Sequence, residues 1–118
     1  LGYLKLGQYQ AMQGRIERAA ATVEEGVRLN PQSAPLFNLL VELYLRQNKP
    51  DKAEEKCREV LRTNPNDAFA HYLLGKIYFA KGLAPRALKE FTVVAASTAE
   101  PDMISWAELM RRRLARTS

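Results

Sequence analysis

The residue types most often used for nucleophilic catalysis, proton transfer and zinc binding each occur once in this 118-residue chain: the single cysteine, Cys57, and the single histidine, His71. A cysteine nucleophile needs a neighbouring base to activate it, and a zinc site needs several Cys, His or acidic ligands at suitable spacings. One cysteine and one histidine do not make such a zinc site, and the sequence contains no glycine-rich phosphate-binding loop. We therefore expect no catalytic residues, no metal, no cofactor and no enzymatic activity.

Both residues instead fall at apolar positions of a 34-residue period. His71 stands where other bulky residues recur, and Cys57 stands where apolar residues recur, so we expect both to pack inside the protein. The two sets of equivalent positions are Tyr3, Phe37 and His71, and Val23, Cys57 and Phe91.

The same period relates residues with specific backbone and packing roles. Gly and Asn tolerate the left-handed backbone needed just after a helix, alanine allows two helices to approach closely, and Asn-Pro ends a helix. A period kept at so many positions indicates a repeat array. The sets are Gly14, Asn48 and Gly82; Ala19, Ala53 and Ala87; Leu6, Leu40 and Leu74; Gly7, Val41 and Gly75; and the pairs Asn30-Pro31 and Asn64-Pro65.

This pattern resembles the tetratricopeptide repeat family, whose 34-residue helix–turn–helix unit carries Leu-Gly and Tyr in its first helix and Ala in its second. Leu74, Gly75, Tyr78, Gly82 and Ala87 match it in one repeat. The resemblance implies an all-α fold, a right-handed α-solenoid of about seven helices forming a single domain over 1–118. Its parts are three repeats, about 1–33, 34–67 and 68–101, and a capping helix, about 102–116.

The sequence departs from the family pattern at a few positions. Val41 stands where a small residue is usual, which predicts a wider helix spacing in the middle repeat. Tyr9 lies one residue before the aromatic position, which Gln10 fills. The third repeat lacks its closing proline, and Pro101 follows two residues late, so the last linker is the least regular boundary.

Apolar spacing and capping residues predict the extent of each helix. The expected helices are 1–13, 16–29, 34–47, 50–63, 68–81, 84–97 and about 102–116. Ser33, Asp67 and Asp102 are expected to cap the third, fifth and seventh helices. The seventh helix should bury Trp106, either Leu109 or Met110, and Leu114, together with Met103.

Charged residues predict exposed helix faces. Glu24 lies four residues before Arg28 and should pair with it. The mixed charges of the fourth helix should form a solvated outer face; they are Lys52, Glu54, Glu55, Arg58, Glu59 and Arg62.

The resemblance implies a function as well as a fold. In this family the first helices line a concave groove that binds an extended or helical peptide, and solenoids commonly use such faces. The expected groove residues are Leu4, Gln8 and Met12; Asn38, Glu42 and Arg46; and Phe69, Tyr72, Lys76 and Phe79.

Some family members bind acidic C-termini of chaperones through a clamp of Lys, Asn and Arg. The matching positions here lack those residue types, so we expect no tight binding of a free C-terminal carboxylate. They hold Leu4, Gln8, Leu39, Phe69 and Leu73.

A protein or peptide partner is thus the first expectation, with its identity unknown. A second hypothesis is self-assembly, in which exposed ends of the array pack on another copy as a homo-oligomer or on further repeats. A third is RNA binding through the basic residues Lys76, Lys81, Arg111, Arg112, Arg113 and Arg116, with the signature of strong salt dependence. The net charge of +5 does not form a repeated basic stripe, which disfavours RNA.

Composition adds few further limits. Hydrophobic content of 47% with 26% charged residues is typical of a soluble globular protein, and no apolar run is long enough to span a membrane. The chain opens at Leu1 inside a helical pattern, so we expect a fragment or processed form. One cysteine does not report the redox compartment, and the localisation stays unknown.

Overall fold

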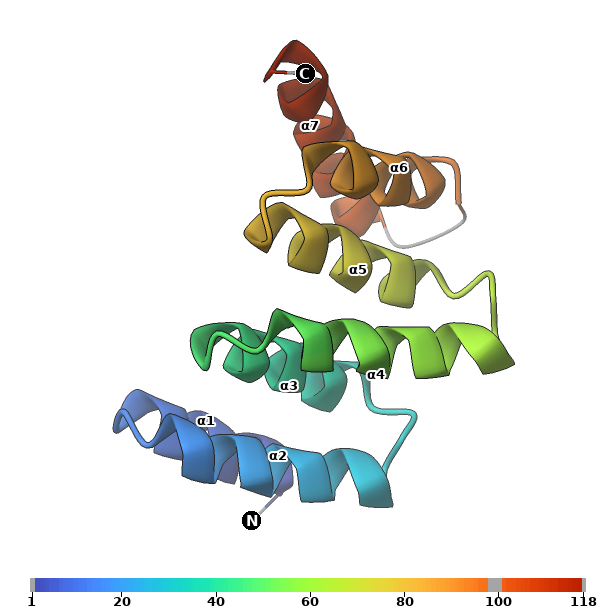
Figure 1. Ribbon diagram of the computed structural model, residues 1–118. Helices are drawn as coiled ribbons and strands as arrows, with labels where there is room; N and C mark the ends of the chain where they lie inside the picture. The colour runs from blue at the N-terminus through green and yellow to red at the C-terminus, as the bar shows by residue number, and fades with distance from the viewer. Residues whose placement is uncertain (1, 98–100, 118) are drawn as a thin grey trace. The chain divides into compact units, whose positions relative to one another are not determined.

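The computed structural model describes residues 2–97 and 101–117, apart from the side chains of Met103 and Thr117. Over these residues it contains seven α-helices and no strand, so the all-α prediction is confirmed, and the helix ends lie within two residues of the predicted ones. The helices are α1 Tyr3–Met12, α2 Ile16–Leu29, α3 Ala34–Arg46, α4 Pro50–Thr63, α5 Ala68–Ala80, α6 Ala84–Ala95 and α7 Pro101–Thr117 (Figure 1).

Helix ends follow the predicted local chemistry. The second residue after α1, α3 and α5 takes a left-handed backbone at Gly14, Asn48 and Gly82, with φ of 79°, 59° and 77°. Ser33 accepts a hydrogen bond from the Leu36 amide at 3.3 Å, and Asp67 accepts one from the Ala70 amide at 3.0 Å.

One predicted cap is wrong. Helix α7 begins at Pro101, which places Asp102 inside its first turn and not before the helix. Proline is well suited to the first helical position, because the N–H that it lacks would have no partner there.

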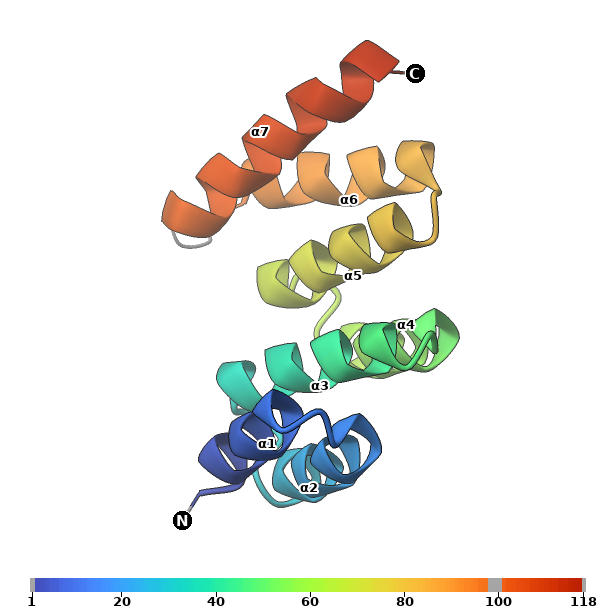
Figure 2. The same cartoon turned by 90° about the vertical axis from the view of Figure 1, so that its left-hand side faces the viewer.

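The chain divides into two compact units, residues 1–53 and 54–118. In the first unit α1 lies against both α2 and α3, as Figure 2 shows, and α2 also packs on α3. Ala19 and Val23 are fully buried in α2. Gly7 and Gly26 permit the close approach of α1 and α2, since a Cβ on Gly26 would lie 2.7 Å from the Cβ of Tyr3 and one on Gly7 would collide with Val23.

One side-chain prediction fails in the first unit. Arg28 pairs with Glu25 (Nε to Oε2, 3.0 Å) and not with Glu24, because Glu24 accepts a hydrogen bond from the Tyr44 hydroxyl of α3 at 2.8 Å. Tertiary contact has therefore displaced a pairing that spacing alone favoured.

In the second unit α5 packs on α6, and α6 packs on α7. The fully buried Phe91 ring lies against Gly75, where a Cβ would be 2.7 Å from the Phe91 Cδ1. The alternative left open in α7 is resolved in favour of Met110, which is 6% exposed, while Leu109 is 55% exposed. Ala107 and Leu114 are also buried, and the predicted role of the Met103 side chain lies outside the described residues.

Candidate peptide-binding faces

The first unit places two of the predicted residue sets on packed helices. Leu4, Gln8 and Met12 recur every fourth residue on α1, so they share one face of that helix. Met12 is 86% exposed and Gln8 is exposed, while Leu4 is half-buried. This face therefore offers an apolar side chain beside a hydrogen-bonding amide.

Helix α3 repeats the spacing with polar residues. Glu42 and Arg46 are exposed and Asn38 is half-buried. The Asn38 amide donates a hydrogen bond to the Glu42 carboxylate at 3.3 Å, which orients both groups at the surface. This face can hydrogen-bond a peptide and carries both signs of charge.

In the second unit, α5 carries the aromatic set. The Tyr72 ring stacks on Phe69 at 6.2 Å between centroids and forms a T-shaped pair with Trp106 at 5.2 Å between centroids. The Lys76 ammonium lies 5.4 Å from the Tyr72 ring centroid. Tyr72 is therefore also a packing residue for α7, whereas Phe79 remains 50% exposed.

A polar cluster joins α4 and α5 of the second unit and was not predicted. Arg58 contacts the Glu54 carboxylate at 2.7 Å and donates to the Tyr78 hydroxyl at 2.8 Å, and Lys81 donates to Glu54 at 3.2 Å. Glu54 is only 16% exposed. The predicted solvated face of α4 is thus wrong at this residue, because Glu54 and Arg58 are engaged with α5.

The electrostatics of this cluster favour a fixed ion network. Burial acts to raise the pKa of Glu54, but hydrogen bonds from Arg58 and Lys81 outweigh it and the pKa is lowered. Burial, followed by the Glu54 charge, raises the pKa of Tyr78. Both groups therefore keep their ordinary protonation states at neutral pH, and the cluster is structural. The sequence feature that could have predicted this cluster is the tyrosine at equivalent positions 44 and 78. Each of these tyrosines faces the second helix of the preceding repeat.

His71 has two partners in the second unit. Its Nδ1 lies 2.6 Å from a Glu90 carboxylate oxygen of α6, and its Nε2 lies 2.8 Å from the Pro65 carbonyl oxygen. Burial acts to lower the pKa of His71, but these two acceptors outweigh it and raise the pKa. Both neighbours are hydrogen-bond acceptors, so the doubly protonated ring, which donates from both nitrogens, can bond to both of them.

Cys57 is fully buried, and burial, followed by the Glu54 charge, raises its pKa to about 12. The thiolate needed for nucleophilic attack is therefore disfavoured. The packing role predicted for Cys57 is confirmed.

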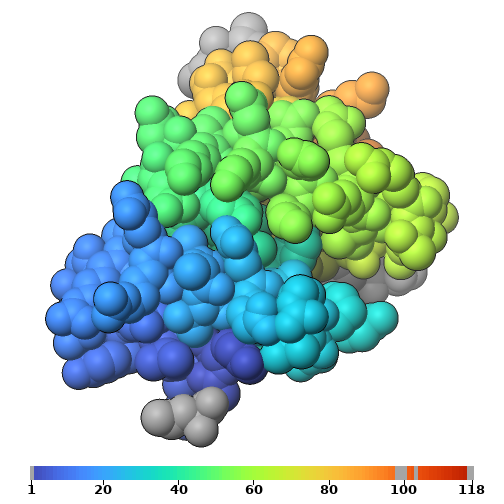
Figure 3. Space-filling model, turned by 60° about the horizontal axis from the view of Figure 1, so that its bottom comes forward, coloured from blue at the N-terminus to red at the C-terminus, as the bar shows by residue number. Residues whose placement is uncertain are grey.

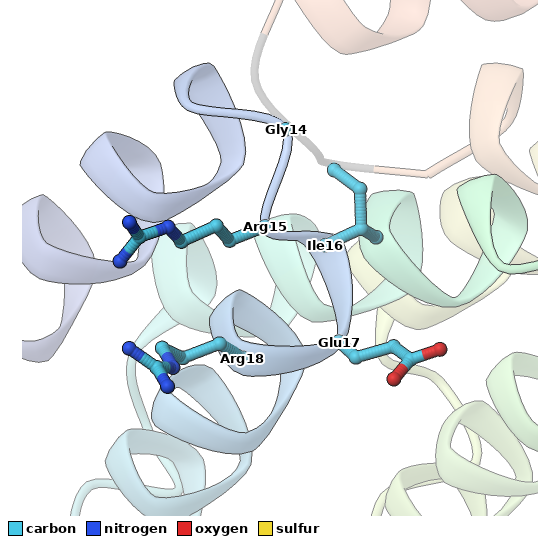
Figure 4. Close-up of a pocket in the computed structure, with 5 residues that line it drawn as sticks. All are labelled: Gly14, Arg15, Ile16, Glu17 and Arg18. Atoms are coloured by element: carbon cyan, nitrogen blue, oxygen red, sulfur yellow. The ribbon is translucent and has the colours of Figure 1, made fainter.

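The turn before α2 forms a pocket of about 540 Å³ lined by Gly14, Arg15, Ile16, Glu17 and Arg18 (Figure 4). Figure 4 shows Arg15 and Arg18 projecting to one side and Glu17 to the other. All three charged side chains are exposed, so the pocket has no desolvated charge that would select a ligand. Among the described residues, no group of three or more His, Cys, Asp or Glu side chains is arranged to hold a metal.

Comparison with known proteins places these faces in context. A family model described as tetratricopeptide repeat matches residues 38–101. The human protein O-mannosyl-transferase TMTC2 is 34% identical over 89 residues, which are 73% of this chain and 11% of that protein. This chain thus spans about a tenth of the length of that relative.

Two solved folds are similar over nearly the whole chain. PcrH from Pseudomonas aeruginosa has a TM-score of 0.76 at 15% identity, covering 96% of this chain and 89% of PcrH; its complex with the chaperone binding region of PopD gives a TM-score of 0.73 at 16% identity, covering 98% and 91%. The first TPR of Spaghetti (RPAP3), bound to the HSP90 peptide SRMEEVD, gives 0.66 at 20% identity, covering 96% and 90%. At these identities the likeness is one of fold, that of helical repeat solenoids.

Proposed function

Because the chain belongs to the tetratricopeptide repeat family, we propose that it is a non-enzymatic protein-interaction module that binds a peptide segment of a partner through the exposed faces of its first helices, α1, α3 and α5. The family's solenoids are typically interaction surfaces and not catalysts. Two structures of the same fold hold a peptide or partner segment, PcrH with the chaperone binding region of PopD and RPAP3 with an HSP90 peptide.

One observation carries the proposal: large apolar side chains stay exposed at the predicted binding positions. Met12 is 86% exposed and Phe79 is 50% exposed, and hydrogen-bonding residues lie on the same kind of face, at Gln8 and Asn38. Apolar anchors beside amide groups suit a peptide, because the anchors bury its side chains while the amides bond its backbone.

The polar and aromatic neighbours define the chemistry of the peptide. Glu42 and Arg46 on α3 present both charges, and Lys76 on α5 stands above the Tyr72 ring. We propose a peptide with apolar anchors and mixed charge, and no dependence on a free C-terminal carboxylate. Leu73, which stands at one clamp position, is fully buried, so it is not available to a ligand.

The experiment is a nuclease-treated capture of proteins from source-cell lysate with the native chain and with the variants Met12→Glu and Phe79→Glu. Each substitution puts a charge where an apolar anchor should dock. Leu109→Glu on α7 is the matched control, because Leu109 is exposed to a similar degree, 55%, and lies on another helix. Tyr72 is left intact because it packs on Trp106.

Partners retained by the native chain and the Leu109 control but lost with either first-helix variant support the proposal. Partners retained equally by all four proteins overturn it. The peptide SRMEEVD serves as a specificity test: we expect no binding near micromolar affinity, and tight binding would contradict the absence of a carboxylate clamp.

The similarity to the mannosyl-transferase carries no proposal of that activity, since this chain covers 11% of that protein. Among the described helices, none is both long and apolar enough to cross a bilayer. RNA binding gains no support from a specific structural feature.

A further inference from the structure

Two apolar positions of the first helix differ sharply in exposure between repeats. Leu6 is 38% exposed, while its equivalents 34 and 68 residues on, Leu40 and Leu74, are 0% and 2% exposed. Tyr9 is 58% exposed, while its equivalents, Leu43 and Ile77, are both fully buried. The same two positions are therefore core in the later repeats and surface in the first.

In the later repeats, the second helix of the preceding repeat lies against this part of the first helix. In the first unit α2 packs on α3: the Tyr44 hydroxyl donates to Glu24 at 2.8 Å, and a Cβ on Gly26 would lie 3.1 Å from Leu36 Cδ2. In the second unit Arg58 of α4 donates to the Tyr78 hydroxyl of α5 at 2.8 Å. A second helix thus meets a first helix in the same way twice.

The corresponding face of α1 is mainly apolar, with Lys5 at its edge, one turn before Tyr9. Tyr3 is 40% exposed beside Leu6 and Tyr9, and Lys5 is the only charged residue in α1. At about 100° per residue, Leu6 points away from the face that carries Leu4, Gln8 and Met12, while Tyr9 lies between Leu6 and Met12. Figure 3 shows α1, in dark blue, at the surface of the first unit. This surface therefore borders the proposed peptide-binding face at Tyr9, but the inference below does not depend on that proposal.

We infer that the face of α1 around Leu6 and Tyr9 is a docking surface for an amphipathic α-helix of the α2 type. The observed contact of α2 with α3 defines the chemistry expected of the docked helix, because a helix docked on α1 would repeat the same interface. Glu24 makes that contact, and Ala20 and Val27 lie about one turn to either side of it on α2, so this stripe holds a small residue, a carboxylate and an aliphatic residue at i, i+4 and i+7.

The residue facing the carboxylate also fits. Gln10 stands at the position of Tyr44, whose hydroxyl binds Glu24 in the interface already formed. The Gln10 side-chain oxygen accepts a hydrogen bond from Thr22 at 2.6 Å. The amide nitrogen is then the group that can donate to a carboxylate on the docked helix.

The probe is a synthetic peptide of residues 16–33, acetylated and amidated, with a lactam joining Ala21→Lys to Glu25. The bridge is needed because an isolated helix of this length is marginal in water. It runs beside the Ala20, Glu24 and Val27 stripe and replaces none of these three residues. Binding to the full chain is measured by isothermal titration calorimetry.

Three proteins are compared: the native chain, Tyr9→Lys, and the matched control Leu109→Lys on α7, with circular dichroism to verify that each is folded. We expect saturable binding to the native chain and the control, weakened at least about tenfold in Tyr9→Lys. A second peptide with Glu24→Lys should also bind less well, because it removes the acceptor for Gln10.

No saturable binding to the folded native chain, or equal binding to Tyr9→Lys, overturns the inference. Sedimentation velocity identifies the competing occupant. The native chain could form concentration-dependent dimers that Tyr9→Lys abolishes and that the peptide does not disrupt. This result would assign the face to a second copy of this chain and would also overturn the inference.

Discussion

A single missing Cβ sets the approach of α5 and α6. Gly75 faces the fully buried Phe91 ring, and a Cβ there would lie 2.7 Å from the ring's Cδ1 and 2.8 Å from its Cζ. We predict that Gly75→Ala destabilises the protein by about 1–3 kcal/mol, because a ring buried on all sides has little space to move. Urea unfolding followed by circular dichroism measures the change.

The repeat itself supplies the compensating variant. The equivalent positions 41 and 57 hold Val and Cys, a large residue with a small one, where the third repeat holds Gly75 and Phe91. Gly75→Val alone should be more destabilising than Gly75→Ala, and Gly75→Val with Phe91→Cys should recover part of the loss. If the double variant is less stable than the sum of its single variants, size matching does not explain the pair.

His71 makes stability depend on pH. The acceptors Glu90 and Pro65 raise its pKa from 6.5, so the folded protein holds this proton more tightly than the unfolded chain. The stabilisation is complete below about pH 6.5 and is lost as the pH rises through the higher pKa of the folded state. We predict that the melting temperature falls over this range, when measured from about pH 5.5 to about pH 8.5.

The chain has one histidine, which makes this prediction specific. His71→Phe places the residue of equivalent position 37 there and should flatten the pH profile, because no imidazole is left to titrate. Glu90→Gln should lower the imidazole pKa, as read from the proton chemical shift of the ring. An unchanged profile in His71→Phe would assign the pH dependence to other groups.

At the scale of single helices, capping side chains set the boundaries. The Asp67 carboxylate accepts from the Ala70 amide at 3.0 Å, and the Ser33 hydroxyl accepts from the Leu36 amide at the longer distance of 3.3 Å. We predict that Asp67→Ala costs about 0.5–2 kcal/mol of unfolding free energy and that Ser33→Ala costs less. Thermal unfolding measures these changes. The control Asp67→Asn keeps a side-chain hydrogen-bond acceptor but removes the charge. If Asp67→Asn is as unstable as Asp67→Ala, the capping hydrogen bond is not the cause of the stabilisation.

Helix ends and turns could be predicted from the sequence because their causes are local. Gly14, Asn48 and Gly82 were identified from the backbone conformation they tolerate, and all three adopt it. Ser33 and Asp67 were identified from their position before an apolar stripe, and both cap their helices. Asp102 failed because Pro101, two residues later than the family pattern, already begins α7.

Contacts between helices could not be predicted in the same way. Glu24 and Glu54 look solvated by spacing alone, yet one binds Tyr44 and the other binds Arg58 and Lys81. Tyr44 lies 20 residues from Glu24, and Lys81 lies 27 residues from Glu54, so only the packed helices bring these pairs together. For the same reason the sequence placed Tyr72 among binding residues without revealing that it also supports Trp106.

At the scale of the whole molecule, two compact units can differ in stability. In the second unit the single tryptophan, Trp106 of α7, forms T-shaped ring contacts with Tyr72 and Phe91, at 5.2 Å and 5.1 Å between centroids, so it links α7 to both α5 and α6. In repeat arrays each element contacts only its neighbours, and the effect of a lost contact decays along the chain.

We therefore predict that Trp106→Ala costs about 2–3 kcal/mol, below the range for a fully buried aromatic because Trp106 is half-buried. Hydrogen exchange read by mass spectrometry should show lost protection over residues 54–97, while residues 3–46 change little. The control Leu109→Ala removes a side chain that is 55% exposed and should change stability by less than about 0.5 kcal/mol. Equal loss of protection in both units would instead mean that the chain unfolds as one cooperative body. Damage to α7 would then weaken the proposed binding faces of α1 and α3 as much as that of α5.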